Sequence, residues 1–347
     1  MDAIIHKCPG CNSVLPFNPA TQRWECPYCG NSYSFSDLQN AAENSQFKQD
    51  NNQPTSEIVA DVYRCSNCGA EMVADQNTTA TFCVYCGSSN IIKNRLEGEF
   101  NPDFVIPFKK VKEDAIKAYQ SCKRGRWFAP KEFGRADLIE KISGVYIPFW
   151  LYDGKTYIDA KYYCTNTSRY RSGDYIVTKK SIYSVIRSGN MAFSKVPCDG
   201  SVKFDDDLMD SIEPFDYSEL KPFNMSYLSG FLAEKYDVDK EQDKKRAELR
   251  MTNTMYSFLR NTIHGYGSVS LDSSRKRTEF PKIYYALFPV WMLNTTYKGK
   301  MYQFAMNGQT GKFIGDIPID KKRFWLIYLF MFLGLMGIGF LVKHFLM

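Results

Sequence analysis

The sequence is poor in the side chain that most often serves acid–base catalysis at neutral pH, since its 347 residues include only three histidines. His6 precedes a cysteine pair, His264 precedes Gly-Tyr-Gly, and His344 follows an apolar run, so none is placed like a general base. The zinc-protease pattern H-E-x-x-H, the hydrolase pattern G-x-S-x-G and the protein-kinase motifs are all absent. We therefore expect that the protein is not an enzyme.

A phosphate-binding loop and a secretory signal are missing as well. The run Gly-Gln-Thr-Gly-Lys at 308–312 has two residues between its glycines where that loop needs four, and Phe313 replaces the Ser or Thr that would hold magnesium. We interpret Asn307-Gly308 as a hairpin turn. Residues 1–13 contain no apolar run, so we expect no signal peptide and a reducing compartment in which cysteines stay free.

Eight of the 11 cysteines form two copies of one metal-ligand pattern. Each copy has two Cys-x-x-Cys pairs, and in each copy fourteen residues separate the inner cysteines. Glycine, or asparagine at Asn12, follows each pair, as the left-handed end of such a turn requires. We predict two structural Zn²⁺ ions, each with four thiolates and no open position for catalysis. The predicted ligands are Cys8, Cys11, Cys26 and Cys29 for one ion and Cys65, Cys68, Cys83 and Cys86 for the other.

A disulfide framework is the alternative interpretation of these cysteines, and it would need an oxidising compartment. The other three cysteines, Cys122, Cys164 and Cys198, are far apart in the sequence and odd in number. We expect them to be ordinary buried thiols.

A long uncharged run lies near the other end of the chain. Residues 324–342 are nineteen residues without a charge, and as a helix they would span about 28 Å, close to the thickness of a hydrocarbon core. Lys321, Lys322 and Arg323 flank the run on one side, whereas only Lys343 and His344 flank the other. The positive-inside rule then predicts a single-pass protein in the cell membrane, with the bulk of the chain in the cytoplasm and the C-terminus on the opposite face.

Charge is divided unevenly along the chain. Residues 1–100 hold six Lys/Arg and eleven Asp/Glu, a net charge of −5, whereas residues 101–347 have a net charge of +11. Nucleic-acid binding depends on Lys and Arg that neutralise phosphates, so we consider it unfavoured at the cysteine-rich region. The basic excess faces either anionic lipid headgroups or solvent.

Five segments follow from these patterns. We predict a zinc ribbon over residues 1–36, a polar linker over 37–60, a second zinc ribbon over 61–97, an α+β aromatic-rich cytoplasmic region over 98–320, formed by one or two domains, and a transmembrane helix over 324–342. The fold class is thus two small zinc-ribbon β modules, an α+β region and one C-terminal transmembrane helix.

Within the α+β region, residues 109–123 and 226–263 have helical patterns, the latter with Tyr227, Phe231, Met255, Phe258 and Leu259 as core positions. Residues 145–163 and 284–317 have strand patterns, with turns expected at Gly154-Lys155 and Gly299-Lys300. Both strand segments contain Pro-x-Trp, at 148–150 and 289–291, which suggests an internal repeat, although coincidence between aromatic strands would give the same pattern. An acidic cluster at residues 205–213 fits an exposed loop or a helix start better than a cation site.

The chain resembles a known group of bacterial proteins. The cysteine pattern resembles a duplicated transcription-factor-IIB-type zinc ribbon. Ile-Pro-Phe at 106–108, Trp-Phe-Ala-Pro at 127–130, the run Gly-Val-Tyr-Ile-Pro-Phe-Trp at 144–150, Phe-Pro-Val-Trp at 288–291 and Asn-Gly-Gln-Thr-Gly-Lys at 307–312 resemble membrane-anchored zinc-ribbon proteins of Firmicutes. That resemblance implies an adaptor associated with membrane-stress systems of the phage-shock type and with flotillin-like partners, and it implies no catalytic residues.

Two functional hypotheses follow. The first is a membrane-anchored cytoplasmic scaffold whose zinc ribbons bind protein partners. The alternative is a membrane-tethered nucleic-acid-binding protein that uses the basic runs at 123–127 and 275–277, because basic stretches beside aromatic residues can bind single strands.

Overall fold

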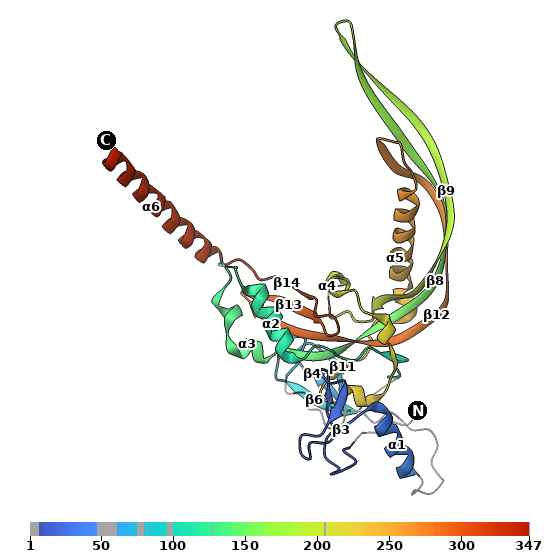
Figure 1. Cartoon of the computed structure of the whole chain (residues 1–347), viewed down its shortest axis with the longest axis vertical. Coiled ribbons are helices and arrows are strands. Elements are labelled where there is room, and N and C mark those ends of the chain that lie inside the picture. The colour runs from blue at the N-terminus through green and yellow to red at the C-terminus, as the bar shows by residue number, and fades with distance from the viewer. Residues whose placement is uncertain are drawn as a thin grey trace.

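A computed structural model describes residues 7–46, 61–74, 80, 82–95, 100–126, 128–204 and 206–346. The predicted linker beyond residue 46 and the predicted motif residues Trp127 and Asp205 lie outside this part of the chain. Figure 1 shows the cysteine-rich N-terminal region at one end of the molecule, and a long β arm and the C-terminal helix α6 leaving the body toward the other end.

The first cysteine module contains a three-stranded antiparallel sheet, formed by β1 (Phe17–Asn18), β2 (Arg23–Glu25) and β3 (Ser32–Tyr33). Helix α1 (Phe35–Gln46) follows directly, so the beginning of the segment predicted as a linker is helical. Ser34 explains the helix start, because its backbone N–H donates to Asp37 while its hydroxyl accepts from the Asp37 N–H. This reciprocal capping, together with burial of Leu38, fixes a helix whose polar composition suggested a coil.

The second cysteine module does not stand apart from the body. Its strands are β4 (Asp61–Cys65), β5 (Glu71–Ala74) and β6 (Ile91–Arg95). Strand β5 pairs antiparallel with β11 (Leu232–Glu234), with Val73 opposite Ala233. This pairing makes the module part of the large sheet. In the described residues the strand order of that sheet is β10 (Lys221–Pro222), β7 (Phe104–Val105), β12 (Ser268–Tyr297), β8 (Ser143–Ser172), β11, β5, β4 and β6.

The body is built from two β-α-β-β units. The first unit is β7 (Phe104–Val105), α2 (Lys112–Lys123), β8 (Ser143–Ser172) and β9 (Tyr175–Asp199); the second is β11, α5 (Lys240–Asn261), β12 (Ser268–Tyr297) and β13 (Lys300–Asn307). The units exchange their first strands, since β7 pairs in parallel with β12 and β11 pairs in parallel with β8. Strands β10 (Lys221–Pro222) and β14 (Phe313–Gly315) extend this sheet at β7 and β13.

Matching hydrogen bonds relate the two units by a local two-fold axis. The N–H of Gly200 donates to the carbonyl of Pro148, and the N–H of Gly308 donates to that of Pro289, both at 2.8 Å. The two tryptophans of the Pro-x-Trp motifs also correspond, since the Trp150 indole donates to Val238 O and the Trp291 indole to Lys110 O, again at 2.8 Å. The repeat suggested by the sequence is therefore a structural duplication of the whole β-α-β-β unit.

The prediction of a turn at Gly154-Lys155 is wrong, because β8 runs unbroken through these residues as a single 30-residue strand. The strand is irregular there only in its register, with a shift in the pairing with β9 between Tyr152 and Gly154 and a shift in the pairing with β12 between Glu279 and Lys282. A Cβ at position 154 would lie 2.4 Å from the Met251 sulfur, so this glycine provides room for helix α5 and not a reversal of the chain. The turn at Gly299 is confirmed, since β12 and β13 form a hairpin there and Gly299 has φ +77°.

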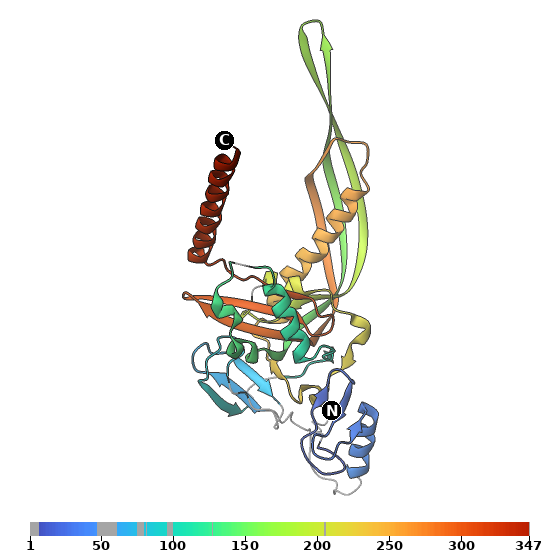
Figure 2. The ribbon, with the colours of Figure 1, turned by 60° about the vertical axis from the view of Figure 1, so that its left-hand side comes forward.

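Strands β8, β9 and β12 extend far beyond the body as the curved arm visible in Figures 1 and 2, with α5 lying along its inner face. The contact is apolar, since Met255 and Leu259 of α5 join Ile158 and Tyr162 of β8 in one buried cluster. The helix begins later than predicted, because β11 and a 3₁₀ turn at Met225–Leu228 precede it. Of its five predicted core residues, Phe258 is exposed and the others are buried.

The remaining helices are short except at the C-terminal end. They are the 3₁₀ turns Lys131–Gly134 and Tyr217–Glu219, α3 (Ala136–Glu140), α4 (Asp206–Ile212) and α6 (Lys321–Leu346). Helix α6 is long and apolar enough to cross a membrane over Lys321–Phe340, and none of that segment is buried. The body holds its first turn, since Arg323 donates to Ala129 O at 2.8 Å and the Phe324 ring packs on Phe128.

Candidate metal centres

The four cysteines of the first pattern come together at one point. Their sulfurs all lie within 4.8 Å of one another, with Cys8 and Cys29 3.4 Å apart and Cys11 and Cys26 3.5 Å apart. Each Cys-x-x-Cys turn is closed by a backbone hydrogen bond, from Asn12 N–H to Cys8 O and from Gly30 N–H to Cys26 O. Asn12 and Gly30 have positive φ, as the sequence indicated.

The second pattern forms the same arrangement. Cys65 and Cys86 are 3.6 Å apart, as are Cys68 and Cys83, and all four sulfurs again lie within 4.8 Å of one another. Gly69 and Gly87, both at φ +72°, close the two turns.

Both sulfur sets fit a tetrahedral zinc ion. A zinc–sulfur bond of 2.3 Å places thiolate sulfurs about 3.8 Å apart, and the distances above are near that value. Each cluster could thus hold one metal ion with all four coordination positions filled. Within the described residues these are the two His/Cys/Asp/Glu groups whose ligand atoms gather in this way.

Within each centre the thiols differ from one another in their electrostatic environment, and the pKa of one is lowered while that of another is raised. In the first, Ser13 Oγ lies 3.0 Å from Cys26 Sγ, and a hydrogen bond from this hydroxyl lowers the pKa of Cys26 to about 6. In the second, burial raises the pKa of Cys83. Ser13 was not singled out from the sequence, although its position between two ligand pairs is a signal that could have identified it.

The clearest difference between the centres lies at one equivalent tyrosine. Tyr28 stands between Cys26 and Cys29, and Tyr85 stands between Cys83 and Cys86. Tyr28 is 79% exposed, whereas Tyr85 is only 4% exposed. The same local motif therefore presents an aromatic side chain to solvent in one module and buries it in the other.

Tyr85 is buried because the body covers this turn of the second module. Its ring packs on Phe204 at 5.3 Å, and the Lys203 ammonium lies over it. Beside it, Asn294 of β12 donates a buried 2.6 Å hydrogen bond to Val84 O. The second module is thus held both by strand pairing and by its own metal-binding turn.

The first module is attached to the body through its sheet, the turn between β1 and β2, where the Gln22 amide donates to Phe108 O at 2.7 Å, and Phe35 of α1, whose ring stacks on Tyr227. The Trp24 indole donates to Ser226 O at 3.0 Å, and the rings of Phe17 and Trp24 pack on Tyr227. The turn at Cys26-Pro27-Tyr28-Cys29 faces outward, with Cys29 and Tyr28 exposed.

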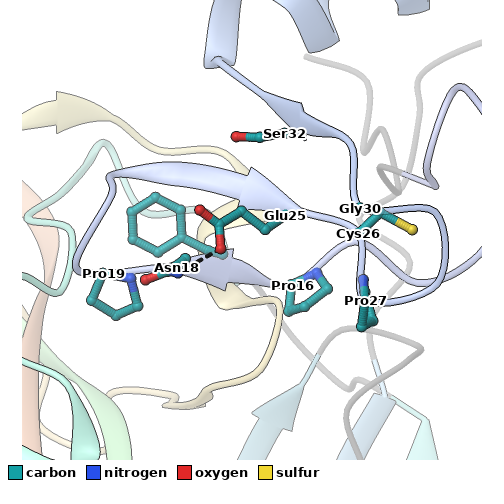
Figure 3. Close-up of a pocket in the computed structure, with 9 residues that line it drawn as sticks. Pro16, Asn18, Pro19, Glu25, Cys26, Pro27, Gly30 and Ser32 are labelled. Carbon is teal, nitrogen blue, oxygen red and sulfur yellow. Dashed lines mark hydrogen bonds between the residues drawn. The ribbon is translucent and has the colours of Figure 1, made fainter.

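A groove lies beside this outward-facing turn. It has a volume of about 510 Å³, and Figure 3 shows three prolines of different loops along it. The carboxylate of Glu25 lies in the groove, where it accepts from Asn18 at 2.6 Å and from Thr21 at 2.7 Å. These two hydrogen bonds lower the pKa of Glu25, so the groove carries a negative charge at neutral pH. The residues that line it are Pro16, Phe17, Asn18, Pro19, Glu25, Cys26, Pro27, Gly30 and Ser32.

In the described part of the acidic cluster, Asp206 begins helix α4, and three carboxylates pair with arginines of helix α5. Arg246 lies 3.2 Å from Asp206 and 2.6 Å from Asp210, and Arg250 lies 2.7 Å from Glu213. These ion pairs give the cluster a structural role in joining α4 to α5.

The other sequence candidates lie apart from the metal centres. His264 is exposed in the loop after α5, while Cys164 and Cys198 are buried and Cys122 is half-buried. The Gly308 carbonyl accepts from the N–H groups of Lys109 and Lys110, so the turn at 308–312 is held against the segment between β7 and α2 and does not form an open cradle.

The basic run at 275–277 is partly paired on the arm. Lys276 lies 3.2 Å from Glu248, and Arg277 lies 2.6 Å from Glu279. Two of its three charges are therefore shared with carboxylates, which weakens the nucleic-acid hypothesis at this site.

Comparison with known proteins gives one full-length relative. No family model matches the sequence, and no solved structure matches it. The "Uncharacterized protein YdjG" of Bacillus subtilis (strain 168) is 36% identical over 321 residues, which cover 92% of each chain. The chain therefore belongs to the same family as the Bacillus YdjG protein.

Proposed function

We propose that this protein is a membrane-anchored cytoplasmic adaptor with two zinc ribbons, in which the first ribbon binds a protein partner. The exposed Tyr28, compared with the buried Tyr85, is the observation that carries the proposal. Aromatic side chains dominate the centres of protein interfaces, and an outward tyrosine on a rigid metal-held turn loses little entropy on binding.

The second ribbon has a structural role in this proposal. Strand pairing with β11 joins this module to the body, and Tyr85 in its metal-binding turn is covered by the body. That tyrosine therefore has no free surface for a partner. With four thiolates on each zinc, neither centre offers a coordination position to a substrate, and the proposal includes no catalysis.

The membrane anchor is helix α6. Lys321, Lys322 and Arg323 stand at its start, which by the positive-inside rule keeps the body in the cytoplasm. In Figures 1 and 2 the first module lies at the end of the molecule away from α6. A partner bound at Tyr28 would then be held in the cytoplasm at a distance from the bilayer. The resemblance noted above makes a phage-shock or flotillin-like membrane-stress system the context in which to search for that partner.

Crosslinking and co-purification from native membranes test this proposal. We expect the full chain to recover a stoichiometric protein partner, and Tyr28→Ala to lose it with both metal ions retained. Ile92→Ala is the matched control, since Ile92 is a 57% exposed apolar side chain on the second module. Recovery of the full chain alone, or equal partner recovery with Tyr28→Ala, would refute the proposal.

A further inference from the structure

The tip of the β arm is a two-stranded hairpin that extends past its supports. Strand β12 starts at Ser268, which pairs with Thr165, and helix α5 ends at Asn261. Strands β8 and β9 continue to pair with each other from Asn166↔Ser181 to Ser172↔Tyr175. Among the described residues, no further strand or helix covers this tip, which projects alone in both views (Figures 1 and 2).

The tip carries large apolar side chains in solvent. Tyr175 and Ile176 beside the turn are 78% and 77% exposed, and Tyr170 is 54% exposed. Ile182 and Ile186, closer to the body, are 57% and 67% exposed. An isolated hairpin is marginal in water, and so many uncovered apolar groups indicate a binding surface.

The same tip is basic. Residues 166–181 contain Arg169, Arg171, Lys179 and Lys180 but only one acidic residue, Asp174, which gives a net charge of +3. A surface that combines tyrosine, isoleucine and unbalanced Lys/Arg matches the headgroup zone of a bilayer, where aromatic rings sit at the boundary and anionic lipids attract the cations.

We propose that the arm tip, residues 166–181, is a second membrane contact that binds the headgroup region of an anionic bilayer. Both views show the arm and α6 leaving the body on the same side, so the anchor holds the tip near the membrane (Figures 1 and 2). The tip stays at the surface, because an open hairpin with unpaired edges cannot enter hydrocarbon. Helix α5 braces the arm through Met255 and Leu259, so contact at the tip fixes the orientation of the whole body.

The inference rests on the membrane anchoring in the proposed function, but it is independent of the protein partner. Hydrogen exchange of the full chain in lipid nanodiscs tests it. We expect the amides of residues 166–181 to exchange more slowly in discs that contain phosphatidylglycerol than in phosphatidylcholine discs, and the difference to disappear at high salt. Failure of the chain to enter either disc would instead refute the anchor.

Two pairs of substitutions sharpen the test. Lys179→Thr with Lys180→Thr should reduce the protection in anionic discs roughly 30-fold, since each basic residue near an anionic surface contributes about a factor of five. Lys221→Thr with Lys240→Thr removes the same charge from exposed positions on the body and should leave the protection unchanged.

Equal exchange in the two discs would overturn the proposal. So would protection that persists in the Lys179/Lys180 variant, because it would point to a protein or a second copy on the tip. Tyr175→Ser with Ile176→Ser should also abolish the protection, and retention of protection in that variant would contradict the apolar part of the contact.

Discussion

Replacing Tyr85 with alanine should destabilise the body, whereas the same change at Tyr28 should not. The two tyrosines occupy the same position in equivalent Cys-x-Tyr-Cys turns, so any general effect on metal binding is shared. They differ in burial, with Tyr85 at 4% and Tyr28 at 79% exposure. The pair therefore isolates what the covered turn of the second module contributes to stability.

The expected cost follows from the packing of the Tyr85 ring. Truncating a buried aromatic side chain costs about 3–5 kcal/mol, because transfer free energy is lost and a cavity remains beside Phe204. For a body of this size that cost lowers the melting temperature by roughly 10 °C. An exposed tyrosine truncated to alanine changes stability by about 0.5 kcal/mol or less.

Thermal unfolding of the full chain in detergent, followed by circular dichroism, measures the difference. Metal content of both variants, determined by atomic emission, is the control, since loss of zinc alone could lower the melting temperature. If the two variants melt together with both metals bound, the second module does not contribute to the stability of the body and our reasoning about its turn is wrong.

Three further predictions concern the metals, the duplication and pH. Metal analysis should find two zinc ions in the wild-type chain and only one in each of the variants Cys26→Ser and Cys83→Ser. Calorimetry should show that Cys83→Ser destabilises the body and that Cys26→Ser does not. Trp150→Phe and Trp291→Phe should each cost about 1–2 kcal/mol in denaturant unfolding, because each leaves a half-buried carbonyl without its donor. Burial raises the pKa of Asp243 to about 6, so the folded state holds this proton more tightly than the unfolded chain. That contribution, up to about 3 kcal/mol, is present in full only below the ordinary Asp pKa of 3.8 and is lost as the pH rises through 6; stability curves of Asp243→Asn should lack this loss.

The sequence predicted the parts that depend on local spacing. Cysteine pairs three positions apart, with glycine or asparagine after them, determine turns that need no distant partner. The hairpin at Gly299 is likewise determined by neighbouring residues, because a glycine there allows the positive φ that the turn requires. Gly154 looked identical in sequence, but its role depends on Met251, almost a hundred residues away, and a pattern of neighbours cannot show that contact.

Contacts between residues far apart in the sequence also explain the other differences between the predictions from sequence and the structure. Glu234 is a charged residue, yet it is fully buried because the Lys203 ammonium and the Ser201 hydroxyl donate to its carboxylate. The second module looked like an independent domain because nothing in residues 61–97 reveals that β5 pairs with β11. The contrast between Tyr28 and Tyr85 is likewise set by the body and not by the motif.

The exchange of first strands between the two units also constrains how the chain acquires its fold during synthesis. Strand β7, at residues 104–105, finds its parallel partner at Ala286 and Leu287 of β12, so it remains unpaired on that side until most of the chain has left the ribosome. Neither unit can complete its sheet before the other exists, which implies slow, cooperative folding with a high contact order. Helix α6 lies immediately beyond these strands, so the body closes at nearly the same moment as its anchor becomes available to the membrane.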